Sequence, residues 1–162
     1  MAFPTTDTLP STPEAAANQD DLLLERQLCF ALTVASRSVV GAYKPVLDEL
    51  GLTHPQYLVM LALWERSPRS LKDIADALLH EPATLSPILR RLEQSGFVTR
   101  KRLPGNERAL AIELTESGKN LREQALAVPG TMMERLGLNR QQVAEIHATM
   151  TRLIETTQHS RP

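Results

Sequence analysis

The chain contains a single cysteine, Cys29, in 162 residues. A cysteine thiolate is a nucleophile that peroxides oxidise, but one cysteine can form neither a disulfide within its own chain nor a multi-cysteine metal site. Apolar residues surround Cys29 at helical spacing, and a lone cysteine on an apolar helix face is usually a small buried hydrophobic residue. The residue pattern by itself therefore favours an unreactive Cys29.

A second chemical feature is a cluster of basic residues between positions 84 and 108. The whole chain has a net charge of −1, and residues 1–25 contain five acids and no lysine or arginine. A protein that is nearly neutral overall can still present one basic face to DNA. The cluster sets six basic residues against only two acids, Glu93 and Glu107, a local excess of +4: Arg90, Arg91, Arg100, Lys101, Arg102 and Arg108.

Two predicted helices precede this cluster. Residues 53–65 predict a helix because Thr53 and Gln56 can form a capping box at its start. Residues 70–78 predict a shorter helix that opens at Ser70 and carries apolar residues at a spacing of three or four.

The basic residues themselves fall on a third helix and a β-hairpin. Residues 84–95 predict a helix that should begin near its first residue, so that Pro87 lies within the first turn, where proline is tolerated. After Gly96 the apolar period changes from about 3.6 to 2. Residues 97–103 and 109–114 therefore predict two strands joined by the turn residues Pro104, Gly105 and Asn106.

The two ends of the chain have different compositions. Residues 1–18 are rich in proline, serine and threonine and predict a disordered tail. A helix is expected from Asp20, with Pro45 bending or ending it, and a last helical region runs from Thr115 to about Thr157, interrupted near residues 128–130 and again near Gly137. The predicted organisation is a tail (1–18), an N-terminal helix region (19–50), a region of short helices and a basic hairpin (51–114) and C-terminal helices (115–162).

The order of these elements predicts a winged helix-turn-helix, a mainly α fold with a small β-hairpin wing. A helix fits the major groove of DNA, and a basic hairpin beside it can reach the neighbouring backbone or minor groove. The expected DNA contacts are Thr84 and Ser86 to bases or phosphates, Arg90 and Arg91 mainly to phosphates, the wing residues Arg100, Lys101 and Arg102, and Arg108 in a minor groove. The alternative is a solvated basic face without a nucleic-acid partner.

Bulk composition excludes several other classes of protein. Apolar residues make up 42% and charged residues 23% of the chain, with no run long enough to cross a membrane. The beginning of the chain does not have the pattern of a secretory signal, which predicts a cytoplasmic protein. The histidines are scattered, so neither a metal site nor a cofactor is expected. The terminal helices carry more apolar residues than a small core needs, which predicts a homodimer that reads an inverted-repeat operator.

The stretch 25–157 resembles the MarR family of winged-helix repressors. The resemblance is carried by the run Leu92-Glu93-Gln94-Ser95-Gly96-Phe97-Val98-Thr99-Arg100, by Asn106-Glu107-Arg108 and by Leu114-Thr115-Glu116-Ser117-Gly118. These segments are similar to the family's recognition helix and wing.

Within that family the chain resembles the organic hydroperoxide resistance regulators, OhrR. The matching segments are Gln27-Leu28-Cys29-Phe30-Ala31-Leu32, Tyr43-Lys44-Pro45, the stretch 52–61 and Leu63-Trp64-Glu65. The resemblance implies that Cys29 is the peroxide-reactive residue and that the Tyr43 hydroxyl hydrogen-bonds its thiolate. It thus implies a sensor and dimerisation region at 19–50, beside the DNA-binding domain at 51–114 and the C-terminal dimerisation helices at 115–162. A second family tyrosine corresponds to His54, which can also donate a hydrogen bond to the thiolate.

The resemblance also implies how oxidation is completed. Oxidation of Cys29 gives a sulfenic acid first. Because this chain has no second cysteine, it is similar to the one-cysteine type, in which a low-molecular-weight thiol caps the sulfenic acid or over-oxidation completes the switch. The expected partners are therefore double-stranded operator DNA, a second copy of the chain, an organic hydroperoxide as signal and a small thiol, with no membrane.

Two alternatives stay open at this stage. A MarR repressor could answer a phenolic ligand or another oxidant such as hypochlorite. A thiol peroxidase would instead consume hydroperoxide as an enzyme. The sequence favours a sensor that is not an enzyme, because its specific residues build a DNA-binding module and it offers no resolving cysteine.

Overall fold

The computed structural model describes residues 19–103 and 106–159. Contacts divide the chain into two compact units, with the boundary between Arg37 and Ser38. The predicted disordered tail, residues 1–18, and most of the predicted wing turn lie outside the described residues.

Helix α1 spans Leu28–Asp48 and differs at both ends from the predicted helix. The residues before it form two short 3-10 helices, Gln19–Leu22 and Leu24–Arg26. The side-chain amide of Gln27 donates to the carbonyl of Leu23 at 3.2 Å and so favours the tighter turns there. At the other end the helix continues past Pro45, which was expected to bend or end it. Pro45 cannot donate to the Gly41 carbonyl, and the helix continues for only three residues beyond it.

Three helices of the second unit form the predicted helix-turn-helix: α2 (His54–Glu65), α3 (Leu71–Leu78) and α4 (Pro82–Gln94). The capping box predicted at Thr53 is present, and Ser70 forms another with Asp73. Helix α4 begins at Pro82 instead of near Thr84, because Pro82 itself occupies the first helical position. Pro87 consequently lies inside the helix.

The wing is the predicted hairpin with one additional strand. Strand β2 (Val98–Leu103) pairs antiparallel with β3 (Asn106–Leu114), which begins earlier than expected. The short strand β1 (Arg69–Ser70) pairs with β3 on its other side, opposite Ile112 and Ala111. This strand was not predicted, since two residues are too few to show an alternating pattern.

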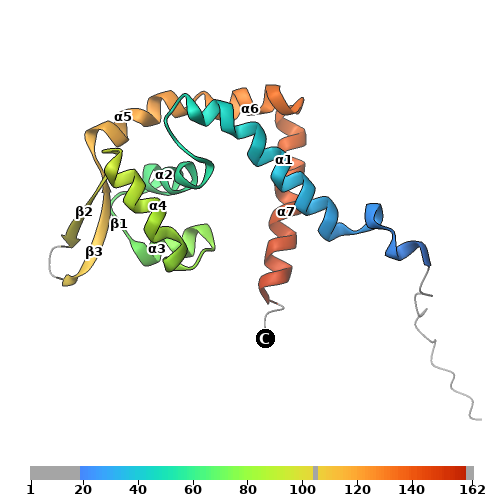
Figure 1. Cartoon of the computed structure of the whole chain (residues 1–162), viewed down its shortest axis with the longest axis horizontal. Helices are drawn as coiled ribbons and strands as arrows, with labels where there is room; N and C mark the ends of the chain where they lie inside the picture. The colour runs from blue at the N-terminus through green and yellow to red at the C-terminus, as the bar shows by residue number, and fades with distance from the viewer. Residues whose placement is uncertain (1–18, 104–105, 160–162) are drawn as a thin grey trace, which may run out of the picture. The chain divides into compact units, whose positions relative to one another are not determined.

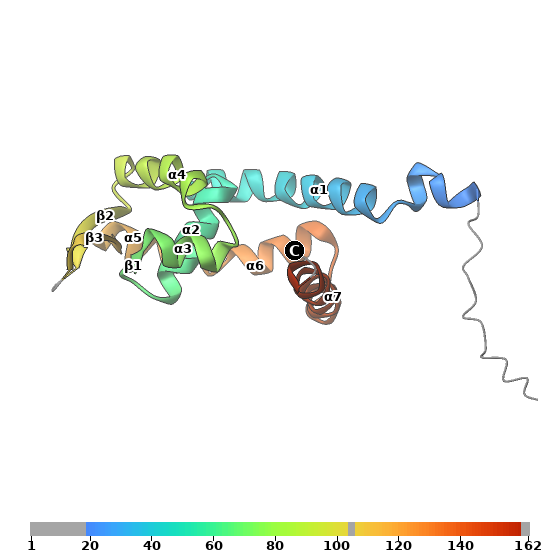
Figure 2. The same cartoon turned by 90° about the horizontal axis from the view of Figure 1, so that it is seen from below.

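The remaining helices are α5 (Glu116–Ala125), α6 (Val128–Leu136) and α7 (Arg140–His159). In the second unit the hairpin lies at one end, beside α3 and α4, and α7 lies at the other (Figures 1 and 2). Gly137, with φ at 64°, ends α6 as predicted. No helix among the described residues is long and apolar enough to cross a membrane.

The junction of the wing with α2 and α5 is held by three hydrogen bonds and by a close approach of two segments at Gly118. The Thr115 N–H donates to the Phe97 carbonyl at 3.1 Å, and the Thr115 hydroxyl donates to the Gly96 carbonyl at 2.6 Å. The indole Nε1 of Trp64 donates to the Gly118 carbonyl at 2.8 Å. A Cβ at Gly118 would lie 2.1 Å from the Phe97 carbonyl oxygen. The junction therefore requires glycine at this position.

We expect Gly118→Ala to destabilise the protein by about 2 kcal/mol or more, because the added methyl group would force the start of β2 away from α5. Gly130→Ala is the matched control, since a Cβ there meets nothing within 4 Å and alanine favours the helix. Urea denaturation of both variants measures the difference. Equal stability of the two would show that the junction can relax without cost.

Candidate DNA interface and sensor site

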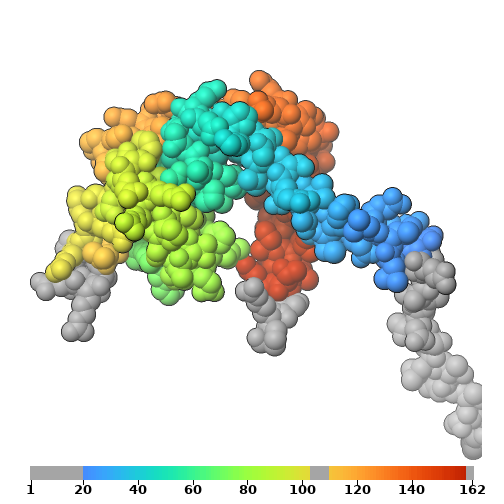
Figure 3. Space-filling view, viewed as in Figure 1, coloured from blue at the N-terminus to red at the C-terminus, as the bar shows by residue number. Residues whose placement is uncertain are grey.

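Helix α4 presents the predicted DNA-contacting residues on its exposed side. Leu85, Leu89 and Leu92 are buried against the core. The exposed residues include four predicted to meet DNA: Thr84, Ser86, Arg90 and Arg91. Helix α4 and the hairpin adjoin on one face of the molecule (Figure 3). This arrangement is what a helix entering the major groove beside a wing requires.

The wing cations are not all available to DNA. The guanidinium Nε of Arg100 lies 3.3 Å from the Glu93 carboxylate at the end of α4, and Lys101 forms an ion pair with Glu113 on β3. Sequence reasoning had not assigned these acids a role. A signal for the second pair was available, because Lys101 and Glu113 occupy diagonal positions on paired strands. The first pair fastens β2 to α4.

Three arginines remain as the main candidates for phosphate contacts. Arg90, Arg91 and Arg102 are exposed, and the described part of the chain holds no ion pair for any of them. The backbone of Arg108 lies in β3, but its side chain is outside the described residues. The structure thus brings together the predicted residues of α4 and β2, while the minor-groove role of Arg108 stays a prediction.

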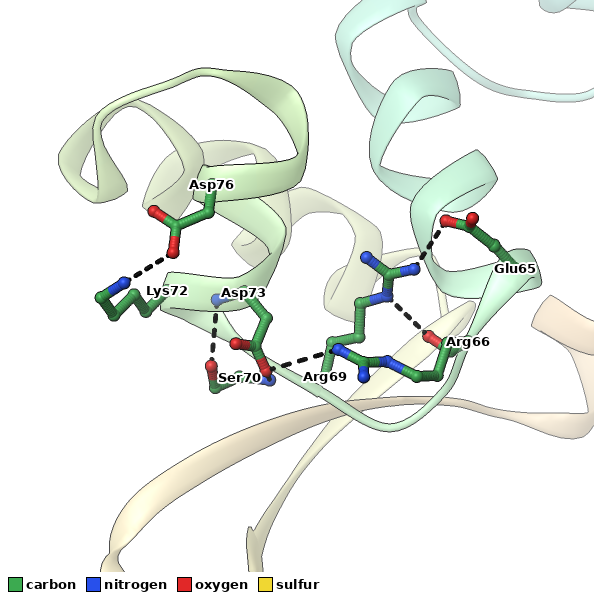
Figure 4. A network of polar contacts seen from close by, with 7 residues as sticks. All are labelled: Glu65, Arg66, Arg69, Ser70, Lys72, Asp73 and Asp76. Carbon is green, nitrogen blue, oxygen red and sulfur yellow. Dashed lines mark hydrogen bonds and ion pairs between the residues drawn. The ribbon is translucent and has the colours of Figure 1, made fainter.

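A polar network joins the end of α2 to the start of α3 (Figure 4). Arg69 is buried, with an ion pair from its Nη2 to Glu65 at 2.7 Å and a hydrogen bond from its Nε to the Arg66 carbonyl at 3.1 Å. Because Arg69 belongs to β1, the network ties α2 to the wing sheet. Sequence reasoning missed this residue, since arginine is rarely buried and β1 was not expected.

Cys29 lies in the first turn of α1, within the first unit, and its side chain is exposed. Its carbonyl accepts a hydrogen bond from the Thr33 hydroxyl at 2.8 Å. Its neighbours Leu28 and Phe30 are also exposed, at 61% and 38%. A thiol in this position is accessible to a small oxidant, contrary to the buried role that the residue pattern alone favoured.

Tyr43 and His54, in the second unit, are brought together. Their ring centroids are 5.5 Å apart in an edge-on arrangement, and the Tyr57 ring lies 6.1 Å from that of Tyr43. The Tyr57 ring in turn meets Trp64 at 6.3 Å. This row of rings runs along α2 from its first residue to the wing junction.

A mostly apolar cavity of about 310 Å³ opens beside His54. Its walls include Val40 and Gly41 of α1 and Leu52 and Pro55 at the start of α2. Lys44 and Asp48 also line it and form an ion pair of 2.7 Å. The cavity can therefore admit a small organic molecule next to the imidazole.

Burial changes the proton affinities of both candidate hydrogen-bond donors. It raises the pKa of Tyr43, so the phenol keeps its proton at neutral pH. It lowers the pKa of His54, so the imidazole is mainly neutral there. A neutral imidazole has one N–H, and each side chain therefore offers one donor.

We expect the protein to lose stability as the pH falls below 6.5, in part through His54. The pKa of His54 is lower in the folded chain than its ordinary value of 6.5, so the unfolded chain binds more protons between the two values. The stabilising contribution is present above pH 6.5 and is lost below it. Urea denaturation should show that the free energy of unfolding falls less between pH 7.5 and pH 5.5 for His54→Gln than for the parent. The control His147→Gln, on the exposed face of α7, should behave like the parent.

We expect Arg91→Gln to weaken binding to duplex DNA and to make it less dependent on salt. Removing one phosphate interaction should reduce the slope of log affinity against log salt by about 0.9. Lys101→Gln should have a smaller effect, because Glu113 already holds the lysine. Arg152→Gln, on α7, controls for the change in net charge. An unchanged slope in Arg91→Gln would remove this residue from the interface.

Comparison with known proteins agrees with this architecture. The MarR family model matches residues 52–110. The organic hydroperoxide resistance transcriptional regulator of Bacillus subtilis is 42% identical over 140 residues, which cover 85% of this chain and 93% of that protein. The regulator SarZ of Staphylococcus saprophyticus is 38% identical over 105 residues, covering 65% of this chain and 72% of that one.

Solved structures of AbfR, a protein of Staphylococcus epidermidis, are similar over 87% of this chain. Reduced AbfR bound to DNA matches with a TM-score of 0.73 and 35% identity, covering 87% of this chain and 96% of that one. Overoxidised AbfR bound to DNA matches with a TM-score of 0.70, and a disulfide form of AbfR with 0.60. With its winged helix and these relatives, the chain belongs to the MarR family of transcriptional regulators and to the organic hydroperoxide resistance type within it.

Proposed function

We propose that two copies of this chain form a repressor that binds an inverted-repeat operator and releases it when an organic hydroperoxide oxidises Cys29. The observation that carries the proposal is the exposed, sole cysteine in a chain whose other distinctive residues build a DNA-binding winged helix. The similarity to the Bacillus subtilis regulator supports it.

The oxidation step needs only the thiolate and the peroxide. The Cys29 thiolate attacks the terminal oxygen of the hydroperoxide, the O–O bond breaks, and the alkoxide takes a proton and leaves as an alcohol. The product on the protein is a sulfenic acid. In the dimer, the Tyr43 hydroxyl and the His54 N–H are the proposed donors to the thiolate. A hydrogen bond to the charged form stabilises that form and raises the reactive fraction.

The second step is the formation of a mixed disulfide with a small thiol. The chain has no second cysteine, so the thiol must come from a small molecule. The sulfenic acid condenses with this thiol to form the disulfide and releases water. We assign DNA release to this adduct. The exposed apolar side chains of Leu28 and Phe30 flank Cys29 and are proposed to be covered by a second copy, and a bulky group there would force the packed helices apart. AbfR in its overoxidised form is bound to DNA, which favours the adduct over further oxidation as the releasing species.

Exposed apolar side chains on two helices support a dimer. Val39 and Val40 on α1 are 38% and 37% exposed. On α7, Val143, Ile146 and Ile154 are 37%, 49% and 45% exposed. At 100° per residue the three side chains of α7 share one face of the helix, and an exposed apolar face usually marks a protein interface. We propose that a second copy covers them and that the dimer sets the spacing of the two α4 helices.

A repressor controlled by a small ligand is the second candidate function. A cavity of about 300 Å³ between α2 and the helices α5 and α6 favours it. Tyr57 and Trp64 contribute aromatic rings to this cavity, and Arg122 a cation. A phenolic or other aromatic molecule would fit these walls, and its effect would not depend on Cys29.

The deciding experiment measures operator binding before and after one equivalent of cumene hydroperoxide with a small thiol. We expect the parent protein to lose affinity by about a hundredfold, which corresponds to about 2.7 kcal/mol. Mass spectrometry should find one thiol adduct per subunit, on Cys29. Cys29→Ser should bind the operator as tightly as the reduced parent, and peroxide should not change its affinity. Release of Cys29→Ser by peroxide would contradict the cysteine switch, and sustained thiol-driven turnover would indicate a peroxidase.

The two tyrosines of the chain provide a matched pair for the sensor site. Tyr43→Phe should slow the oxidation of Cys29 by about tenfold, which corresponds to the free energy of one hydrogen bond to a charged group. Tyr57→Phe makes the same chemical change in the neighbouring ring and should leave the rate unchanged. Equal rates in both variants would remove Tyr43 from the proposed thiolate site.

A further inference from the structure

The outward face of the first two turns of α4 is apolar. At 100° per residue, Ala83 and Pro87 point away from the core-facing Leu85 and Leu89, and both are exposed. Thr84 and Ser86 flank them on opposite sides and are also exposed, so the centre of this face is apolar and its two edges are hydroxyl side chains. The exposed side of a helix is ordinarily polar, so this face requires an explanation.

The same two turns contain none of the side chains that make bidentate contacts to bases, and Thr84 and Ser86 offer only single hydroxyl groups. Residues 82–89 read Pro-Ala-Thr-Leu-Ser-Pro-Ile-Leu, without a charged or amide side chain. Bidentate contacts to guanine need arginine or lysine, and those to adenine need asparagine or glutamine. The Ser86 hydroxyl donates to the Pro82 carbonyl at 3.3 Å, within the helix itself. Arg90 and Arg91 follow only in the third turn, beyond the N-terminal residues that meet base edges in this architecture.

One feature of the major groove suits an apolar helix face. Each thymine presents a 5-methyl group there, which small apolar side chains and the methyl group of threonine can contact. We propose that Ala83, Thr84 and Pro87 recognise the operator through thymine methyl groups, so that thymines in each half-site are selected by apolar contact. This inference rests on the proposed function, because it requires α4 to enter the major groove.

The test uses the full-length reduced protein and the operator mapped by footprinting on its own upstream DNA. Each thymine in a protected half-site is replaced by uracil, which removes the methyl group and leaves every hydrogen-bonding group in place. We expect a loss of about fourfold in affinity for each contacted methyl, the equivalent of burying one methyl or methylene group. Uracil outside the footprint is the DNA control.

Two substitutions at one exposed position assign the contact to the protein. Thr84→Ser removes the methyl group and keeps the hydroxyl, whereas Thr84→Val keeps a methyl and removes the hydroxyl. At the base pair that Thr84 contacts in each half-site, replacing thymine by uracil should not change the affinity of Thr84→Ser. Thr84→Val should still bind the thymine duplex more tightly than the uracil duplex. Equal unfolding temperatures would establish that both variants fold like the parent.

A second change to the DNA separates methyl recognition from other features of the base pair. Replacing a contacted T·A pair by C·G should lower affinity, and 5-methylcytosine at the same position should restore part of it. Unchanged affinity for the uracil duplexes would overturn the inference and show that α4 reads the groove by hydrogen bonds or shape. Failure of the proposed function looks different: without operator binding the protein would protect no DNA site at all, and without the cysteine switch the oxidised protein would stay bound while the measurements on the reduced protein were unaffected.

Discussion

The close approach of the Phe97 carbonyl to Gly118 fixes the start of the wing against the start of α5. No side chain fits between these two segments, and the Thr115 hydrogen bonds close the same gap from the other side. The Gly118 carbonyl accepts the indole N–H of Trp64, so α2 is held at the same point. Because the hairpin and α2 both depend on this junction, the geometry of the DNA-binding face depends on it as well. A packed junction of this kind moves as a unit and does not deform gradually.

Helix α2 physically connects the candidate sensor site with the DNA-binding elements. Its first residue, His54, contacts Tyr43, and its last, Glu65, holds Arg69 of β1. Its twelve residues correspond to a length of about 18 Å, and the capping box at Thr53 keeps its first turn regular. Helix α2 is therefore one continuous element from His54 to the residues that hold the wing sheet and the start of α3. The row of rings from Tyr43 through Tyr57 to Trp64 adds a packed contact along the same path.

Sequence patterns predicted the parts of this fold that local chemistry determines. The capping box at Thr53, the opening of a helix at Ser70, the core stripe of α4 and the hairpin all follow from side-chain hydrogen bonds or apolar periodicity. Strand β1 and the Glu93–Arg100 ion pair depend on residues that meet only after folding, so a local pattern does not reveal them. The start of α4 was expected near Thr84, because Pro87 would then lie in the first turn, but Pro82 occupies the first helical position. The roles of Cys29, Tyr43 and His54 came from family resemblance alone, since a cysteine in an apolar helix has no distinctive spacing.

The distribution of charge bears on how readily the protein could release DNA. The basic excess between residues 84 and 108 suggests strong attraction to phosphate, but two of these cations are held by Glu93 and Glu113 within the domain. Fewer phosphate contacts mean that affinity depends more on placing both α4 helices correctly in successive major grooves. A hundredfold loss of affinity requires about 2.7 kcal/mol, roughly the value of one or two good base contacts. On the proposed function, a modest change in the spacing of the two helices, imposed by a thiol adduct in the dimer, is then expected to free the operator.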